Sequence, residues 1–474
     1  MTPEQEQREL LRRRKARREE KRQQARKEKK KVQLQLLAVG LFLLLAAGTV
    51  AVFTMRQSGA APTEPSVAQP VQPTADSAPE TGLRVPQTGG TAETGGTLAT
   101  GPLTVETVPP TTEADSPRET EREEYTVIHI AAAGDLNVTA EVVEHAKTDA
   151  GYDFEPAFQE VAPLLSGADL TLLNLEGTMA GEPYGDDRSS APVELAQTLK
   201  SMGVDVVQTA NSASVRAGIL GLQDTIKNLY GAGLVPVGTF YDSRSFRDSG
   251  GYTIVEVDGM RIALVAFTKG MDNLGLPQGS EDCVNLLYED YTTTYKDIDR
   301  AGIRKVLRNV QEEQPDLTIA MLHWGSEYNE DISKSQKSIR SLMLEEGVDL
   351  ILGTHSHLVQ TVEYDEEAGT LVAYSLGDFF GDADQPGSNY SIVLDVEVTR
   401  DNLTGEVRIS GYSYTPIFTV RPEDSDMGGH RVVQLEDAIR RYETGFIGKV
   451  TPDIYSSMTH ALARVDQRVN RELE

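Results

Sequence analysis

The stretch from Gly347 to Gln360, GVDLILGTHSHLVQ, joins a short apolar run directly to two closely spaced histidines. An apolar run of this length, rich in Val, Ile and Leu, predicts a buried strand of an α/β sheet. Ligands of such sheets bind beyond the carboxyl ends of the strands. His355 and His357 therefore follow a predicted strand at the position where a binding site is expected. On extended backbone the two imidazoles would point apart, but in a loop both can turn toward a metal pair.

The same arrangement occurs at four other places in the chain. Asp135 follows YTVIHIAAAG, Glu176 follows DLTLLNL, Asn211 follows VDVVQTA, and His323 follows DLTIAML. Carboxylate, amide and imidazole groups gathered along one sheet edge are what a two-metal site needs. Mixed oxygen and nitrogen donors suit Zn²⁺, Mn²⁺ or Fe rather than Ca²⁺. The predicted metal ligands are Asp135, Glu176, Asn211, His323, His355 and His357.

Each candidate also has a purely structural explanation. His323 precedes the only tryptophan, so it is also explained as a satisfied core histidine, and an Asp in a turn often only caps a helix. Glu176 has a stronger case, because burying an unpaired carboxylate is costly. Asn174 alternates with it and is expected to donate a hydrogen bond. Glu327, in HWGSE, is either an acceptor that orients an imidazole or a surface carboxylate.

Strands and helices alternate from Tyr125 onward, which predicts an α/β domain. Glycine or proline follows the ends of the first four expected helices. Two predicted hairpins, one turning at Asp258-Gly259 and one at DNLTG, interrupt the alternation and favour a layered sandwich with mixed sheets. The expected strands are Tyr125–Ala133, Leu170–Leu173, Val204–Thr209, Leu317–Leu322, Leu350–Leu352, Thr370–Tyr374 and the hairpin pairs Tyr252–Val257 with Arg261–Phe267 and Ser391–Thr399 with Glu406–Tyr414. The expected helices are Val193–Met202, Ile219–Tyr230, Ile303–Gln314, Gln336–Glu346, Val432–Tyr442 and Tyr455–Arg471.

The N-terminal part predicts a membrane anchor. Residues 34–55 are almost wholly apolar and long enough to span a bilayer. A basic segment, residues 1–33, precedes them, so the N-terminus is expected in the cytoplasm and the rest of the chain outside. A cleaved signal peptide is the alternative, but both segments are too long for it. Residues 56–124 are rich in Thr, Pro and Gly and are expected to be a disordered linker.

Charge is distributed unevenly along the chain. Its formal net charge is −28, yet residues 1–31 hold 14 Lys and Arg against 6 Asp and Glu, so the remainder carries −36. An acidic surface of this size argues against nucleic acid as a partner. An anionic ligand would therefore need a metal ion or a local basic pocket. The basic segment is expected to contact anionic lipid headgroups. Cys283 is the only cysteine, so the chain has no intramolecular disulfide.

These motifs together resemble the capsule biosynthesis family typified by CapA, linked to poly-γ-glutamate, within the calcineurin-like metallophosphoesterase superfamily. The strings that carry the resemblance are AGDLN, DLTLLNLEG, GVDVVQTAN, LHWGSEY, GVDLILGTHSHLVQ and YSLGDF, the last of which contains Asp378. The resemblance implies a four-layer α/β/β/α sandwich of metallophosphoesterase type over residues 125–420, with two divalent metal ions. Residues 421–474 would form a C-terminal helical extension. Asp378 is expected to support the metal ligands.

One motif departs from the family pattern. Where the family has A-N-N-H-x-x-D-x-G, this chain has ANSASVRAG, so Ser212, Ala213 and Arg216 replace the second Asn, the His and the Asp. In the superfamily that His–Asp pair helps to protonate the leaving group. Asn211 would reach the site only if the loop shifts. Arg216 is either a group that binds phosphate or carboxylate, or a surface arginine.

Two functions follow from these expectations. The first is a membrane-anchored, extracytoplasmic CapA-like protein of capsule or other surface-polymer biosynthesis, in which hydrolysis is slow or absent. The second is a non-catalytic module that binds metal or scaffolds a polymer synthase complex. Ala213 and Arg216 favour the second, and the retained histidines favour the first. The expected partners are membrane lipid and an anionic surface polymer or its synthase complex.

Overall fold

The computed structural model describes residues 103–104, 124–185, 189–381, 385–425, 428–445 and 450–472. The basic segment 1–33 and the apolar span 34–55 lie outside these ranges, as does most of the predicted linker. Within the described ranges, no helix has the length and apolar character needed to cross a membrane. The anchor and its orientation therefore stay predictions.

Two mixed sheets form the framework of the protein. In one, the strand order is β17-β16-β15-β2-β5-β6-β7, with β14 also paired to β2; in the other it is β1-β8-β9-β10-β11-β13-β12. The first sheet comprises β2 (Tyr125–Asn137), β5 (Leu170–Glu176), β6 (Val206–Gln208), β7 (Val235–Val237), β14 (Asp378–Phe380), β15 (Tyr390–Asp401), β16 (Val407–Val420) and β17 (Arg431–Gln434). The second comprises β1 (Leu103–Thr104), β8 (Thr253–Val257), β9 (Met260–Thr268), β10 (Leu317–His323), β11 (Leu350–Thr354), β12 (Val362–Asp365) and β13 (Thr370–Ala373). The prediction of a layered sandwich with mixed sheets is confirmed.

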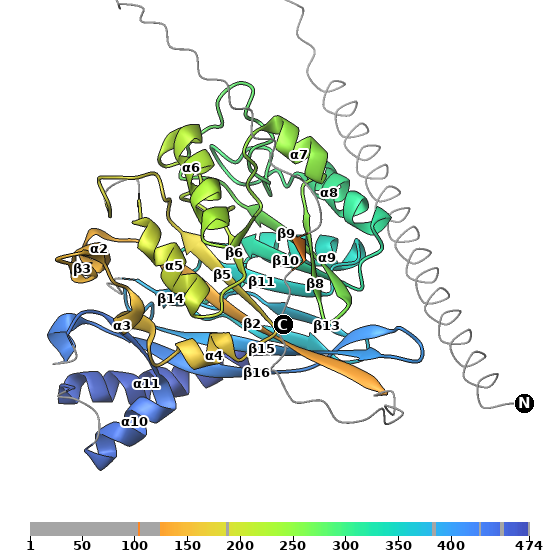
Figure 1. Ribbon diagram of the computed structural model, residues 1–474. Helices are drawn as coiled ribbons and strands as arrows, with labels where there is room; N and C mark the ends of the chain where they lie inside the picture. The colour runs from red at the N-terminus through yellow and green to blue at the C-terminus, as the bar shows by residue number, and fades with distance from the viewer. Residues whose placement is uncertain are drawn as a thin grey trace, which may run out of the picture. The chain divides into compact units, whose positions relative to one another are not determined.

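Strand residues alternate between three buried clusters, which define the layers. Ile130 on β2 and Ile319 on β10 belong to one cluster, which lies between the two sheets. Ala131 on β2 faces the opposite way, toward a cluster formed with helices such as α5 (Val193–Ser201). Ala320 on β10 likewise faces α8 (Arg300–Glu312) and α9 (Lys334–Glu345), which cover the outer side of that sheet (Figure 1). Helices thus cover the outer faces of both sheets.

Further helices precede the C-terminal segment. They are α2 (Ala140–His145), α3 (Glu155–Phe158), α4 (Ala162–Ser166), α6 (Gly218–Gly231) and α7 (Ser243–Ser249), and a small hairpin is formed by β3 (Lys147–Thr148) and β4 (Gly151–Tyr152). The four internal helices predicted from glycine and proline stops are all present, with ends shifted by a few residues. Both predicted hairpins are also confirmed, as β8 with β9 and β15 with β16.

The C-terminal helices share the central core of the sandwich. The structure has α10 (Leu435–Thr444) and α11 (Pro452–Val469) side by side below β16 (Figure 1). Leu435 and Val465 are buried in the cluster that lies between the sheets. The prediction that α10 begins at Val432 is wrong, because Val432 and Val433 form part of β17, which pairs antiparallel with β16. Edge pairing with a long strand overrides the local apolar pattern there.

Candidate metal centre

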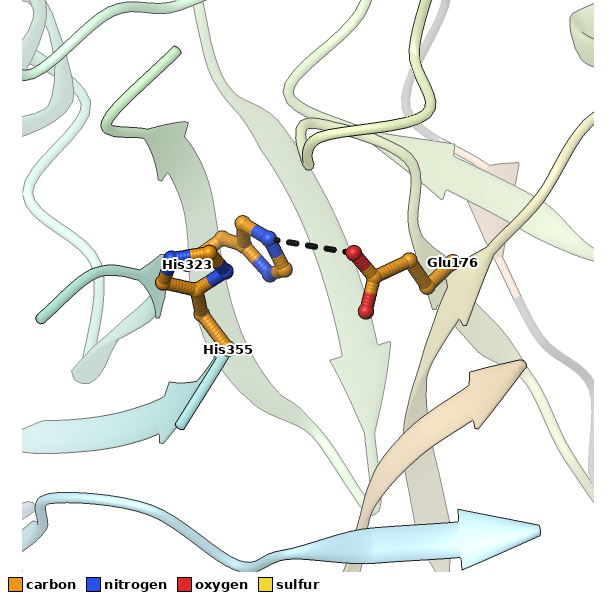
Figure 2. A group of neighbouring side chains, drawn as sticks. All are labelled: Glu176, His323 and His355. Carbon is orange, nitrogen blue, oxygen red and sulfur yellow. Dashed lines mark ion pairs between the residues drawn. The ribbon is translucent and has the colours of Figure 1, made fainter. Parts of the chain in front are cut away.

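The sequence had suggested that the candidate ligands gather along one sheet edge. In the structure they come from both sheets. Asp135 lies near the end of β2 and Glu176 ends β5, whereas His323 ends β10 and His355 directly follows β11. Figure 2 shows the imidazole of His323 pointing toward the carboxylate of Glu176, with the imidazole of His355 beside that of His323. The carboxyl ends of strands in two packed sheets therefore build one cluster.

Asp135 is fixed by the close approach of a third segment. Its backbone nitrogen donates a hydrogen bond of 3.0 Å to the carbonyl oxygen of Gly377. A Cβ atom at Gly134 would lie 1.8 Å from that carbonyl oxygen, so only glycine fits before Asp135. The Asp135 carboxylate accepts bonds from the Asn174 amide at 2.5 Å and from the His355 backbone nitrogen at 2.9 Å. The predicted hydrogen-bonding role of Asn174 is confirmed.

The loop after β11 turns both histidines toward the cluster. His355 has φ 87° and His357 has φ 57°, values in the left-handed region that few residues other than glycine adopt. The bond from the His355 nitrogen to Asp135 links this loop to the other sheet. His357 Nδ1 lies 2.8 Å from Asp378 Oδ1, and its ring stacks on Tyr328 at 5.1 Å between centroids. The loop geometry expected from the sequence is therefore present.

The ligand atoms lie close enough to share a cation. His323 Nε2 is 3.5 Å from Glu176 Oε1, and His357 Nε2 is 4.0 Å from Glu176 Oε2. Two atoms that share one tetrahedral zinc ion at about 2.1 Å lie roughly 3.4 Å apart. In two sets of three residues around Glu176, the ligand atoms all lie within 4.8 Å of one another: one set adds His323 and His355, and the other adds Asp135 and His357. Glu176 belongs to both sets.

Several buried ligand atoms form no hydrogen bond within the protein. Glu176 Oε2, His323 Nε2 and both ring nitrogens of His355 are buried and form no hydrogen bond among the described residues. Buried polar atoms are nearly always satisfied, and an unpaired one costs about 1–3 kcal/mol. Glu176, His323 and His355 each offer one ligand atom within 4.8 Å of the others, so a cation bound there would satisfy an atom of each residue.

The electrostatics of the cluster favour a bound cation. Burial raises the pKa of Asp135 to about 6, and burial together with the charge of Asp135 raises the pKa of Glu176 to about 7. Burial lowers the pKa of His323 and of His355, so both imidazoles are neutral, which is the form that binds metal. Burial alone would lower the pKa of His357. The charge of Asp378 and the hydrogen bond between Asp378 and His357 outweigh this effect, so the pKa of His357 is raised. A divalent ion would offset the cost of ionising the two carboxylates.

The motif ANSASVRAG places Asn211 differently from its prediction as a metal ligand. The Asn211 amide nitrogen donates to Asn174 at 3.0 Å and to the Leu175 carbonyl at 2.6 Å, and its oxygen accepts from the Ala213 nitrogen at 3.0 Å. Both ends of this amide are therefore engaged. The Ser212 hydroxyl instead donates to Glu176 Oε1, so Ser212 occupies the position beside the ligands.

The other predicted residues lie around the cluster. Asp378, on β14, is in register with Asp135 and holds His357, as expected of a supporting group. Glu327 is exposed, and one of its oxygens lies within 4.8 Å of ring nitrogens of His355 and His357. Arg216 pairs with Asp272 at 2.5 Å and donates to Ser189 at 2.8 Å. Its guanidinium is near enough to Glu176 to lower the pKa of that carboxyl.

A cavity of about 300 Å³ opens beside the cluster. It is lined by Ser212, Lys269, Gly270, Asp272, Asn273, Tyr295, Ser326, Glu327 and His355. Most of these residues belong to the segment between β9 and α8, for which the sequence gave no periodic pattern. In the sequence, only the position of Lys269 could have indicated its place in the cavity wall, because Lys269 directly follows β9, the strand beside β10.

Comparison with known proteins identifies the family. The model of the family described as bacterial capsule synthesis protein PGA_cap matches residues 129–383, more than half of the chain, and the chain belongs to this family. The resemblance inferred from the motifs is thereby confirmed. The matched region contains every predicted ligand.

Curated relatives show the same similarity. The chain is 26% identical over 301 residues to the capsule biosynthesis protein CapA of Bacillus anthracis, covering 62% of this chain and 68% of that protein. It is 24% identical over 292 residues to the PGA biosynthesis protein CapA of Bacillus subtilis, covering 60% and 71%. The calcineurin-like phosphoesterase YfkN of Bacillus subtilis has a TM-score of 0.38 and 14% identity, covering 72% of this chain and 97% of that chain. A likeness this weak carries no argument about activity.

Proposed function

We propose that this protein holds a divalent metal centre of metallophosphoesterase type and acts in the biosynthesis of a surface polymer. The observation that carries the metal centre is the set of buried atoms on Glu176, His323 and His355 that form no hydrogen bond in the described part of the chain. Asp135 and His357 complete the two overlapping ligand sets. Mixed carboxylate and imidazole donors suit Mn²⁺, Fe or Zn²⁺.

The residues around the centre set what it can do. Bound divalent ions supply Lewis acidity and lower the pKa of a coordinated water. Asn174 and Ser212 fix the orientation of the carboxylates by hydrogen bonding, and Asp378 fixes His357. The cavity lined by Lys269 and Tyr295 gives a ligand access to His355.

The role in polymer biosynthesis rests on the relatives. Both CapA proteins are named for capsule or PGA biosynthesis, and the family model carries the same description. We place the domain outside the cytoplasmic membrane, tethered by residues 34–55 through the linker 56–124, with the basic segment inside. An anionic surface polymer or its synthase complex would then be within reach of the tethered domain.

A second function, a metal-binding module without turnover, is favoured by one observation. Ala213 is fully buried and stands where the family pattern has His, and Arg216 pairs with Asp272 where the pattern has Asp. Proton donation to a leaving group typically contributes about 10²–10⁴-fold to rate. Its loss here would leave slow hydrolysis or only binding.

The test combines metal analysis with activity. Full-length protein is expected to retain divalent metal after gel filtration and to lose it with His323→Ala. Phosphodiesterase and γ-glutamyl amide assays then separate the two functions, since metal without turnover supports the binding module. The double variant Ala213→His with Arg216→Asp is expected to raise phosphodiesterase turnover by about 10²-fold if the hydrolase was silenced at these positions. A protein that takes up no divalent ion would overturn the proposal.

A further inference from the structure

Lys269 is a half-buried cation without an anionic partner. It follows β9 and lines the cavity beside the metal centre. No carboxylate forms an ion pair with it among the residues that the structure describes. Burying a charge without pairing it is costly, so an unpaired cation in a cavity wall is an unusual feature. Arg216, by contrast, is bound to Asp272.

The surroundings of Lys269 hold its ammonium group in one place. Its Nζ donates a 3.0 Å hydrogen bond to the Gly325 carbonyl oxygen and lies 4.6 Å from the centroid of the Tyr295 ring. A Cβ atom at Gly270 would lie 2.8 Å from that ring, so glycine is needed for the ring to approach. A carbonyl and an aromatic face attract an ammonium but do not neutralise it.

Burial and two nearby carboxylates act on the pKa of Lys269 in opposite directions. Burial lowers the pKa of Lys269, and the charges of Glu327 and Asp272 act in the opposite direction. Asp272 is already engaged by Arg216. The whole chain carries a net charge of −28. An anion can therefore approach at a fixed positive group such as the one in this cavity.

We propose that Lys269 binds an oxyanion of the ligand, a phosphate or carboxylate oxygen, in the cavity beside the metal centre. Arg216, which the sequence had suggested for this role, instead donates hydrogen bonds to Asp272 and Ser189. This assignment deepens the proposed function, because it assumes that the cavity serves the metal centre. It names an acidic group as the part of the ligand that is recognised.

Direct binding measurements on full-length protein test the assignment. Inorganic phosphate and glutarate are the probes, and the tighter of the two identifies the kind of oxyanion. Lys269→Met keeps the apolar stem and removes the charge, so the dissociation constant for the preferred anion should rise about 10-fold or more. Lys269→Arg, which keeps the charge, should lose less.

A matched control separates a local effect from a general one. Lys305 also lies over an aromatic ring, 5.3 Å from the centroid of Phe246, but lines no part of the cavity. Lys305→Met should bind both anions as the unchanged protein does. Equal binding by Lys269→Met and the unchanged protein, or equal losses in both methionine variants, would overturn the assignment. So would failure of the unchanged protein to bind either anion at millimolar concentration.

Metal content keeps this result apart from the proposed function. Binding is measured on protein as purified and after chelator treatment, with the metal content of each sample determined. Anion binding that depends on Lys269 in a protein that holds no metal would reject the metal centre alone. If the protein retains metal and its anion binding does not depend on Lys269, only the inference about Lys269 is rejected.

Discussion

His355→Ala should separate metal binding from folding, because the imidazole forms no hydrogen bond within the part of the chain that the structure describes. Both ring nitrogens of His355 are buried and unsatisfied, and burial keeps the ring neutral. In metal-free protein, removing two unsatisfied atoms recovers about 1–3 kcal/mol. Truncating the ring leaves a cavity that costs a similar amount. The free energy of unfolding of the metal-free protein is therefore expected to change by no more than about 1–2 kcal/mol.

The metal-bound protein should respond differently. At a metal concentration of 100 times the dissociation constant, binding stabilises the folded state by about 2.7 kcal/mol. If loss of His355 weakens binding about 100-fold, the same concentration stabilises the variant by only about 0.4 kcal/mol. The metal-induced gain should thus fall to a small fraction of its original value.

Urea unfolding followed by tryptophan fluorescence measures both quantities. Trp324 is the only tryptophan, is fully buried and directly follows His323, so its emission reports on the folded core at the site. His129→Ala is the control, because His129 lies on β2 and pairs with Asp395 away from the cluster. A His355→Ala protein that kept the full metal-induced gain would refute the reasoning.

Three further variants test the fold that holds the site. Phe158→Ala removes a fully buried ring stacked on Phe379 at 5.7 Å and should lower the free energy of unfolding by about 3–5 kcal/mol in urea titrations. Gly134→Ala would place a Cβ 1.8 Å from the Gly377 carbonyl, so it should reduce both metal content and thermal stability. Burial raises the pKa of Asp349 to about 6, so its protonated form stabilises the fold at low pH and this contribution is lost as the pH rises through 6. Asp349→Asn should therefore melt above the unchanged protein at pH 8, and the difference should vanish near pH 4; a constant difference would contradict this.

Residues placed by strand ends were predictable from the sequence. Asp135, Glu176 and His323 each follow an apolar run, and the strand direction alone brings their side chains to the carboxyl ends of the sheets. The sequence did not show that two sheets contribute, because the packing of one sheet on the other depends on contacts between distant residues such as Ile130 and Ile319.

Residues placed by irregular segments were not predictable. Lys269 and Tyr295 meet only because the chain between β9 and α8 folds back over the site, and such a segment has no periodicity to interpret. Ser212 was noted only as a replacement, yet its hydroxyl reaches Glu176 because the Asn211 amide is engaged by Asn174 and Leu175. These positions follow from tertiary contacts rather than from local pattern.

Anomalous diffraction from crystals soaked with Mn²⁺ or Zn²⁺ tests the central claim most directly. The account predicts an anomalous peak about 2.0–2.3 Å from a Glu176 oxygen and from nitrogens of His323 and His355, with a second peak near Asp135 and His357. No peak among these side chains at saturating metal, or peaks only at exposed carboxylates elsewhere, would contradict it.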